Sequence, residues 1–387
     1  MNPSDRSLFD MPADDPADAP RQTVYLNTAY VGPRLKAVSD AGRKAVDLYA
    51  TPWLLSGDHW FGAPERLRET VARLLTVHPD SIALVPSASY AIAIAAKNLP
   101  VAAGEGIVIV EEQYPSNVYA WRRRAEESGA VLRVAGRSAA RPLTESVLEL
   151  VDSNTAVVAI PNCHWTDGEL IDVVAIARAA RAAGAALVID ASQSLGALPI
   201  DIAAVKPDFL VSVGYKWLLG PYGLGYLYVD EAWQTRGIPL EETWVARRGS
   251  EDFSKLVEYV DEYRAGARRF DYGEFSRFIA VAMATAAISQ LNRWGASYIA
   301  AELNERAERV RTMCARTGLA TLAAERSAPH IVGIRIPEEL EPAKFGEALA
   351  CAGIHVSVRG RTIRVAPHLH TDEPDLERFG SVLGKLL

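Results

Sequence analysis

The strongest constraint on the fold is an alternation of short β-branched runs with longer alanine-rich stretches between residues 65 and 229. The β-branched runs have the length of buried strands, and the alanine-rich stretches are long enough for helices. A chain that alternates in this way builds βαβ units around a mainly parallel sheet. The sequence therefore predicts an α/β fold for this part of the chain.

Seven strands and the helices between them can be placed from this pattern. We expect strands at residues 82–85, 107–110, 131–134, 156–160, 186–189, 209–213 and 224–229, which makes a mainly parallel seven-stranded sheet. The clearest helices are expected at residues 90–99, 116–128 and 173–183. Gly184 should end the last of these, because glycine readily adopts the left-handed conformation that closes a helix.

Beyond Gly273 the pattern changes to two long helices, expected at residues 275–293 and 296–317. Shorter elements follow, with strands at residues 331–336, 355–358 and 363–365 and helices at residues 343–352 and 374–387. Domains commonly hold about 100 to 200 residues, so a chain of this length favours two. We therefore predict an N-terminal arm over residues 1–22, a large cofactor-binding domain over 23–272, and a small C-terminal α/β domain with its linking helices over 273–387.

Composition excludes several classes of function. The net charge is −7 and the basic residues are scattered, so no continuous positive face for nucleic acid is expected. The first 22 residues are rich in Pro, Asp and Ala without an apolar run, which predicts a mobile arm rather than a signal peptide. We find no candidate membrane span. The three cysteines form no C-x-x-C pair, which favours the cytoplasm.

Two strand ends carry the residues with the clearest chemistry. Asp190 follows one apolar strand, and Tyr215 and Lys216 follow another. The carboxyl ends of parallel strands form one edge of a sheet, where α/β folds bind ligands. A lysine amine forms an imine with an aldehyde, and a carboxylate can hold a pyridinium nitrogen protonated, so the pair indicates pyridoxal 5'-phosphate. The alternative is a structural aspartate and a surface lysine.

The segment VPSASY at residues 85–90 predicts a phosphate site at the start of a helix. The N–H groups of Ala88 and Ser89 would face the phosphate at the positive end of the helix dipole. Simple N-capping by serine is the alternative. The glycines of GPYGLGYLYV precede a strand rather than a helix, which argues against a dinucleotide-binding loop.

These residues, in this order, resemble the class V aminotransferase family, which includes cysteine desulfurases, selenocysteine lyase, kynureninase and isopenicillin N epimerase. The resemblance extends from YLNTAYVGP at residues 25–33 to IRVAPHLHTDEPDLERF at residues 363–379. It implies a fold type I pyridoxal-phosphate transferase in which Lys216 holds the cofactor as a Schiff base and Asp190 binds the ring nitrogen. The other cofactor contacts that it implies are Gln193, Ala88, Ser89, Tyr114, Asn117 and Tyr215.

The same resemblance implies a substrate site. Arg364 resembles the arginine that binds the substrate α-carboxylate, with Asn27, His164 and Trp165 beside it. Arg364 could instead form a surface ion pair, Tyr114 could serve packing alone, and His164 could be a polar loop residue. The pair His368 and His370 lacks a third ligand, so we expect a solvent-facing loop and no metal.

The sequence departs from the family pattern at two positions. Desulfurases have a nucleophilic cysteine just before the carboxylate-binding arginine, whereas HVSVRGRTIRV at residues 355–365 has none. Cys163 is the one cysteine expected to approach the pocket. Many relatives have Gly-Thr where a partner subunit touches the cofactor phosphate, whereas FDYGEF places Glu274 at the threonine position. A homodimer with its active site near the interface is still expected.

The resemblance implies chemistry on an amino acid through an external aldimine and an α-carbanion, with Lys216 as general base. Loss of a group from the β-carbon would make the protein a β-eliminating lyase, and we favour a C–S type lyase without a persulfide cysteine. A class V aminotransferase or an amino-acid epimerase is the alternative. A non-catalytic cofactor-binding protein is a further possibility, but the presence of Lys216, Asp190 and Arg364 together argues against it.

Overall fold

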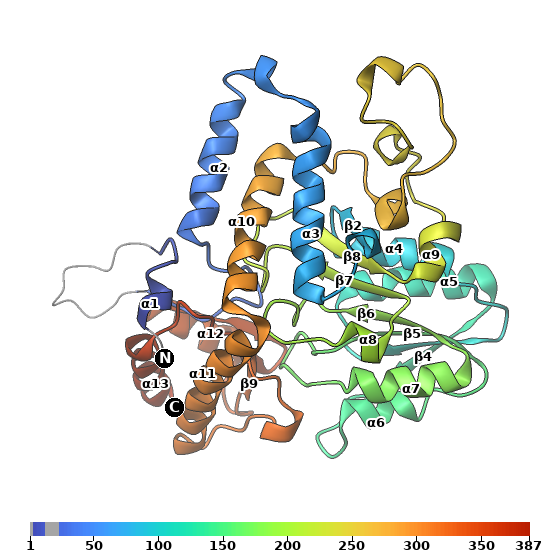
Figure 1. Ribbon diagram of the computed structural model, residues 1–387. Helices are drawn as coiled ribbons and strands as arrows, with labels where there is room; N and C mark the ends of the chain where they lie inside the picture. Colours follow the sequence, from blue (N-terminus) through green and yellow to red (C-terminus); the bar gives the residue numbers. More distant parts are fainter. Residues whose placement is uncertain (1–2, 12–22) are drawn as a thin grey trace.

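A computed structural model describes residues 3–11 and 23–387 (Figure 1). Its largest sheet has seven strands in the order β2-β8-β7-β6-β5-β3-β4. Strand β8 runs antiparallel to both of its neighbours, and every other neighbouring pair in this sheet is parallel. The mainly parallel α/β sheet is therefore confirmed. Its strands are β2 (Ile82–Val85), β3 (Gly106–Val110), β4 (Val131–Ala135), β5 (Thr155–Pro161), β6 (Ala186–Asp190), β7 (Phe209–Val213) and β8 (Gly225–Val229).

Helices cover both faces of this sheet (Figure 1). Alternate residues of a strand enter different cores: Leu84 packs on one side and Val85 on the other. This alternation fixes the register of the strands, because a shift by one residue would exchange the two faces. The first face is covered by α3 (Ala63–Leu75), α6 (Leu143–Leu148), α7 (Val173–Ala183), α8 (Ile202–Val205) and α10 (Phe278–Trp294), and the second by α4 (Ala88–Asn98), α5 (Tyr119–Ser128) and α9 (Glu231–Arg236).

Helix α7 shows why the sequence pattern located its ends so closely. The side chain of Asp172 accepts hydrogen bonds from the backbone N–H groups of Val174 and Ala175 at the first turn. Gly184 follows the last turn with a φ of 75°, as expected for a glycine that ends a helix. The observed bounds are those predicted.

The C-terminal part contains a second, three-stranded antiparallel sheet in the order β11-β12-β9. Its core is shared with β1, so Val24 and Leu26 pack against C-terminal helices. We expected a single strand at residues 355–358, which is wrong, because residues 354–355 pair with β1 while residues 357–359 pair with β12. The elements are β1 (Val24–Tyr25), α2 (Lys36–Leu48), α11 (Ala296–Arg316), β9 (Val332–Arg335), α12 (Pro342–Cys351), β10 (Ile354–His355), β11 (Ser357–Arg359), β12 (Thr362–Val365) and α13 (Glu373–Leu386).

The first residues of the predicted mobile arm are packed rather than extended into solvent. Helix α1 (Pro3–Arg6) is followed by Phe9, which is buried and stacks on Trp294 at 6.1 Å between ring centroids. The carboxylate of Asp5 accepts hydrogen bonds from Trp294 Nε1 and Tyr298 Oη. Residues 1–2 and 12–22 of the arm lie outside the described residues, and the proposed domain boundaries stay predictions.

His368 and His370, which we expected on a solvent-facing loop, are fully buried. Phe9 covers both rings, with centroids 5.9 and 5.5 Å away, and His370 Nε2 lies 2.8 Å from the carbonyl oxygen of Tyr25. The expectation was wrong because residues from the opposite end of the chain cover this loop. The described residues contain no group of three His, Cys, Asp or Glu side chains able to hold a metal. Nor does any described helix combine the length and hydrophobicity needed to cross a bilayer.

Candidate active site

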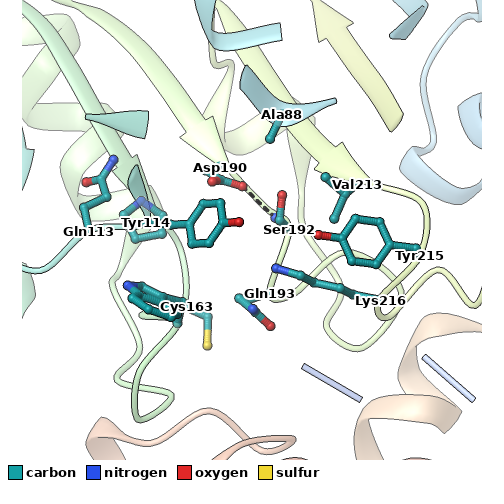
Figure 2. Close-up of a pocket in the computed structure, with 12 residues that line it drawn as sticks. Ala88, Gln113, Tyr114, Cys163, Asp190, Ser192, Gln193, Val213, Tyr215 and Lys216 are labelled. Atoms are coloured by element: carbon teal, nitrogen blue, oxygen red, sulfur yellow. Dashed lines mark hydrogen bonds between the residues drawn. The ribbon is translucent and has the colours of Figure 1, made fainter. Parts of the chain in front are cut away.

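A cavity opens at the carboxyl ends of β5, β6 and β7, beside the start of α4. Figure 2 shows side chains that enter it from several sides, with Tyr114 facing Tyr215 across the space and Lys216 below Asp190. This is the edge at which α/β sheets bind ligands. Its walls are formed by Ala88, Gln113, Tyr114, Pro161, Cys163, Trp165, Asp190, Ser192, Gln193, Val213, Tyr215 and Lys216.

Lys216 lies in the turn after β7 and is 7% exposed. Its Nζ atom is 5.1 Å from the ring centroid of Tyr114. Burial lowers the pKa of the amine to about 8, although the charge of Asp190 acts in the opposite direction. A substantial fraction of the amine is therefore neutral near pH 8 and able to act as a nucleophile or a base.

A close backbone contact holds the turn that carries this lysine. The N–H of Gly32 donates a hydrogen bond to the carbonyl oxygen of Tyr215 at 2.7 Å. A β-carbon at Gly32 would lie 2.1 Å from the carbonyl oxygen of Lys216, which no side chain could accommodate without moving the backbone. The glycine of YLNTAYVGP therefore lets the N-terminal loop lie directly against the lysine turn.

Asp190 is the last residue of β6 and is 6% exposed. Its Oδ1 atom accepts a hydrogen bond from the N–H of Ser192 at 2.9 Å, drawn as a dashed line in Figure 2. The Ser192 hydroxyl is buried without a hydrogen-bond partner among the described residues. The amide of Gln193 is engaged at both ends, because it accepts from Trp217 Nε1 at 3.0 Å and donates to the carbonyl oxygen of Ala29 at 3.1 Å.

The start of α4 fits a phosphate group. The Ser87 side chain caps the helix by accepting a hydrogen bond from the N–H of Tyr90, and Ala88 reaches the cavity wall. The first N–H groups of any helix lack partners within the helix, and the dipole favours an anion there. Ser89 is exposed and does not line the cavity, and its hydroxyl donates to Ser116 Oγ at 2.8 Å.

Aromatic rings form the walls on two sides. The Tyr114 ring meets Trp165 edge to face at 5.5 Å, and the Tyr215 ring lies 4.7 Å from Tyr222. Asn117 is fully buried beyond the cavity wall, where its Oδ1 atom accepts a hydrogen bond from Trp121 Nε1 at 2.8 Å. A flat ligand ring would fit between these aromatic groups.

The substrate residues suggested by the sequence divide into two groups. Arg364 is 1% exposed and donates to the carbonyl oxygen of Trp165 and to Ser357 Oγ, while its Nε atom has no partner among the described residues. Ser357 in turn donates to Asn27 Oδ1 at 2.8 Å, so Asn27 lies behind this cluster. Trp165 alone of the predicted substrate residues lines the cavity itself.

His164 does not reach the cavity wall. Its side chain is fully buried, with Nδ1 2.8 Å from Thr166 Oγ1 and Nε2 3.1 Å from the carbonyl oxygen of Glu111. Burial lowers the pKa of this imidazole to about 4, so the ring is neutral at pH 7. It supports the loop that carries Trp165.

Two polar wall residues were not identified from the sequence. Gln113 lies beside Tyr114, and its amide bonds to the N–H of Val110 and the carbonyl oxygen of Asn117. Ser192 lies two residues after Asp190. Both are direct neighbours of predicted site residues, and that adjacency was the available signal.

The fold and the site together define a class: an α/β protein of fold type I whose cavity holds a lysine able to form an imine, a carboxylate suited to a ring nitrogen and a helix start suited to a phosphate. The site residues fit pyridoxal phosphate, because the unpartnered Ser192 hydroxyl and the open start of α4 both lie where such a group would need polar contacts. The chain belongs to the class V aminotransferase family, whose model matches residues 57–376. It is therefore a pyridoxal-phosphate-dependent class V enzyme that acts on amino acids.

Individual relatives agree with this assignment. The chain is 28% identical to an uncharacterized aminotransferase, YcbU, of Bacillus subtilis over 92% of this chain and 93% of that protein. It is 24% identical to isopenicillin N epimerase of Streptomyces clavuligerus, covering 82% of this chain and 83% of that protein. The fold matches the cystine C–S lyase C-DES with a TM-score of 0.84 at 19% identity, over 93% of this chain and 97% of that one. Another C-DES structure contains glycine covalently linked to pyridoxal phosphate.

Proposed function

We propose that this protein is a β-eliminating lyase that cleaves a carbon–sulfur bond in an amino acid without a persulfide-carrying cysteine. The observation that carries the proposal is the complete burial of Cys163. It lines the cavity but is fully buried, and burial raises the pKa of its thiol. A cysteine that attacks sulfur must be exposed and ionised, so Cys163 does not meet the requirement.

The other cysteines are no better placed. Cys314 is buried on α11, and Cys351 is exposed on α12, and neither lines the cavity. The described residues therefore offer no cysteine suited to carry a persulfide. A carbon–sulfur bond would therefore be cleaved by elimination.

The residues of the cavity have separate tasks in this reaction. When bound, pyridoxal phosphate supplies an electron-accepting ring that stabilises negative charge on the α-carbon of an amino acid. Asp190 would hold a proton on the ring nitrogen, and the start of α4 would bind the phosphate. Lys216, with its lowered pKa, would take the proton from the α-carbon.

Arg364 would fix the orientation of the substrate. Its guanidinium is held on β12 by Trp165 and Ser357, and a planar guanidinium can bind a carboxylate through two parallel hydrogen bonds. With the α-carboxylate held there, the α-proton can face Lys216. Loss of that proton and departure of the sulfur group with its bonding electron pair yield an enamine, which adds water to give pyruvate and ammonia.

The test is turnover without a keto acid. Purified, cofactor-loaded protein incubated with S-substituted cysteines should release pyruvate many times per site. An aminotransferase, the alternative favoured by the name of the Bacillus subtilis relative, would stop after one turnover. A single turnover, or interconversion of L and D amino acids without pyruvate, would replace the lyase proposal.

Cysteine variants test the elimination route directly. Cys163→Ser should keep most of the activity, and Cys351→Ser on the exposed face of α12 serves as the matched control. Loss of turnover in Cys163→Ser alone, with the cofactor absorption band and the circular dichroism intact, would make Cys163 the nucleophile.

We also propose a homodimer in the cytoplasm. Exposed and half-buried aromatic side chains form one connected cluster: the exposed Tyr49 contacts the half-buried Phe278, Phe278 contacts the half-buried Trp60, and Trp60 contacts the exposed Trp244 and Phe253. Connected apolar surface of this kind commonly marks an interface between subunits. The free thiols of all three cysteines suit a reducing compartment. Light scattering that reports a monomer at micromolar concentration would refute the dimer.

A further inference from the structure

A wide groove continues outward from the cavity. Gln113 and Trp165 line both spaces, so they form the junction between them. The groove is open to solvent, and its walls come from both the large sheet's loops and the C-terminal sheet. A substrate that is bound near Lys216 would extend its side chain past Trp165 into this groove.

Arginines dominate the charged walls of the groove. Four of them are paired with carboxylates. Arg137 pairs with Glu112 and Asp167, Arg326 pairs with Glu169, and Arg335 and Arg361 share Glu338.

Arg359 differs from these four arginines. It ends β11, is half-buried, and places its guanidinium 5.5 Å from the ring centroid of Trp165. Its guanidinium donates a hydrogen bond to the carbonyl oxygen of Val358 at 2.8 Å. Within the described part of the chain, no carboxylate lies at ion-pairing distance from it. A cation stacked on an aromatic ring at the junction is therefore without a counter-charge.

The surroundings make this free charge costly in the absence of a ligand. Arg359 is close enough to Lys216 and Arg364 for its charge to lower the pKa of both groups. Asp190 is the carboxylate on the cavity wall, and it would be occupied by the cofactor ring nitrogen. The substrate α-carboxylate would balance Arg364 and leave Arg359 to be balanced by a second anion.

We propose that Arg359 determines specificity by binding an acidic group at the end of the substrate side chain. Under the proposed function, on which this inference rests, the preferred substrates are cysteine derivatives whose sulfur substituent carries a carboxylate. The Trp165 ring would lie against one face of the Arg359 guanidinium, and the substrate carboxylate would bind the N–H groups on the side away from this ring.

Matched acid and amide probes test this directly. L-glutamate and L-glutamine have the same shape and no group to eliminate, so their binding to the cofactor-loaded protein can be measured by calorimetry. We expect at least tenfold tighter binding of L-glutamate, equivalent to about 1.4 kcal/mol. The ratio of kcat/KM for S-carboxymethyl-L-cysteine over S-carbamoylmethyl-L-cysteine should show the same preference.

Three variants identify the residue responsible. Arg359→Gln should remove the preference for the acid while leaving affinity for L-glutamine unchanged, and Arg359→Lys should keep part of it. Arg335→Gln is the matched control, because Arg335 lines the same groove but pairs with Glu338. Its acid preference should equal that of the wild type.

The outcomes separate this inference from the proposed function. Equal affinity of the wild type for L-glutamate and L-glutamine, or a preference that persists in Arg359→Gln, overturns the role of Arg359 and leaves the lyase proposal standing. An acid preference that depends on Arg359, without pyruvate from any cysteine derivative, supports the subsite and overturns the lyase.

Discussion

Replacing Asp271 with alanine should destabilise the fold severely, because it removes one half of a buried ion pair. Arg68 is fully buried on α3, and its Nη2 atom lies 2.6 Å from Asp271 Oδ2. Asp271 Oδ1 also accepts a hydrogen bond from the N–H of Leu84 at 2.8 Å. The pair therefore ties α3 to β2, the strand that leads into the start of α4.

The magnitude follows from what the substitution leaves behind. Breaking a surface pair costs little, but Asp271→Ala leaves the fully buried Arg68 guanidinium without water and with only the weaker contact to Glu65, whose Oε2 atom lies 3.3 Å from Arg68 Nε. Breaking such a pair typically costs about 3 to 5 kcal/mol. The exposed pair Arg43 and Asp40, 2.9 Å apart, provides the control, and Asp40→Ala should cost less than about 1 kcal/mol.

Urea unfolding of the apoprotein measures both effects without a contribution from ligand binding. The double variant Arg68→Met with Asp271→Leu should recover most of the loss, because it removes both charges and retains apolar volume. The reasoning is refuted if Asp271→Ala unfolds within about 1 kcal/mol of the wild type, or if the double variant is less stable than the single one.

Four further outcomes concern the site itself. Borohydride reduction of the loaded protein should leave a pyridoxyl group on Lys216 alone, and mass spectrometry that finds it on another lysine would contradict the assignment. The rate at which Lys216 reacts with the aldehyde should rise through about pH 8, since the protonated amine below that pKa is unreactive. In Asp190→Asn that midpoint should move to lower pH, because the charge of Asp190 raises the pKa of Lys216. An unchanged midpoint would show that the charge of Asp190 does not affect the pKa of Lys216. Asp190→Ala should weaken cofactor binding and lose turnover, and unchanged turnover would remove Asp190 from the mechanism.

The central sheet and the strand-end residues were predictable because their signals are local. Strand β7 ends at Val213, as its apolar run indicated, so Lys216 follows it at the sheet edge. Asp190 ends β6 in the same way. Register between parallel strands then brings both ends to one cavity without further information.

What could not be predicted depends on contacts between distant parts of the chain. The burial of His368 results from packing by Phe9, and nothing in either local sequence indicates that contact. The interruption at Val356 arises because β10 and β11 have different partners. Arg359 was likewise unremarkable in sequence, since its lack of a counter-ion is a property of its surroundings.

The parallel pairing of β1 with β10 has a consequence for synthesis on the ribosome. Val24 pairs with Ile354, and Asn27 forms a bridge with Ala366. These N-terminal residues can therefore pair only after residues 354–366 have been synthesised. The central sheet can assemble earlier, since its strands end at Val229. Contacts so far apart in sequence form late, because the closure of a long loop must precede them. The N-terminal loop that presses Gly32 against the lysine turn is joined to β1, so a nascent chain completes its active site only after its last strands emerge.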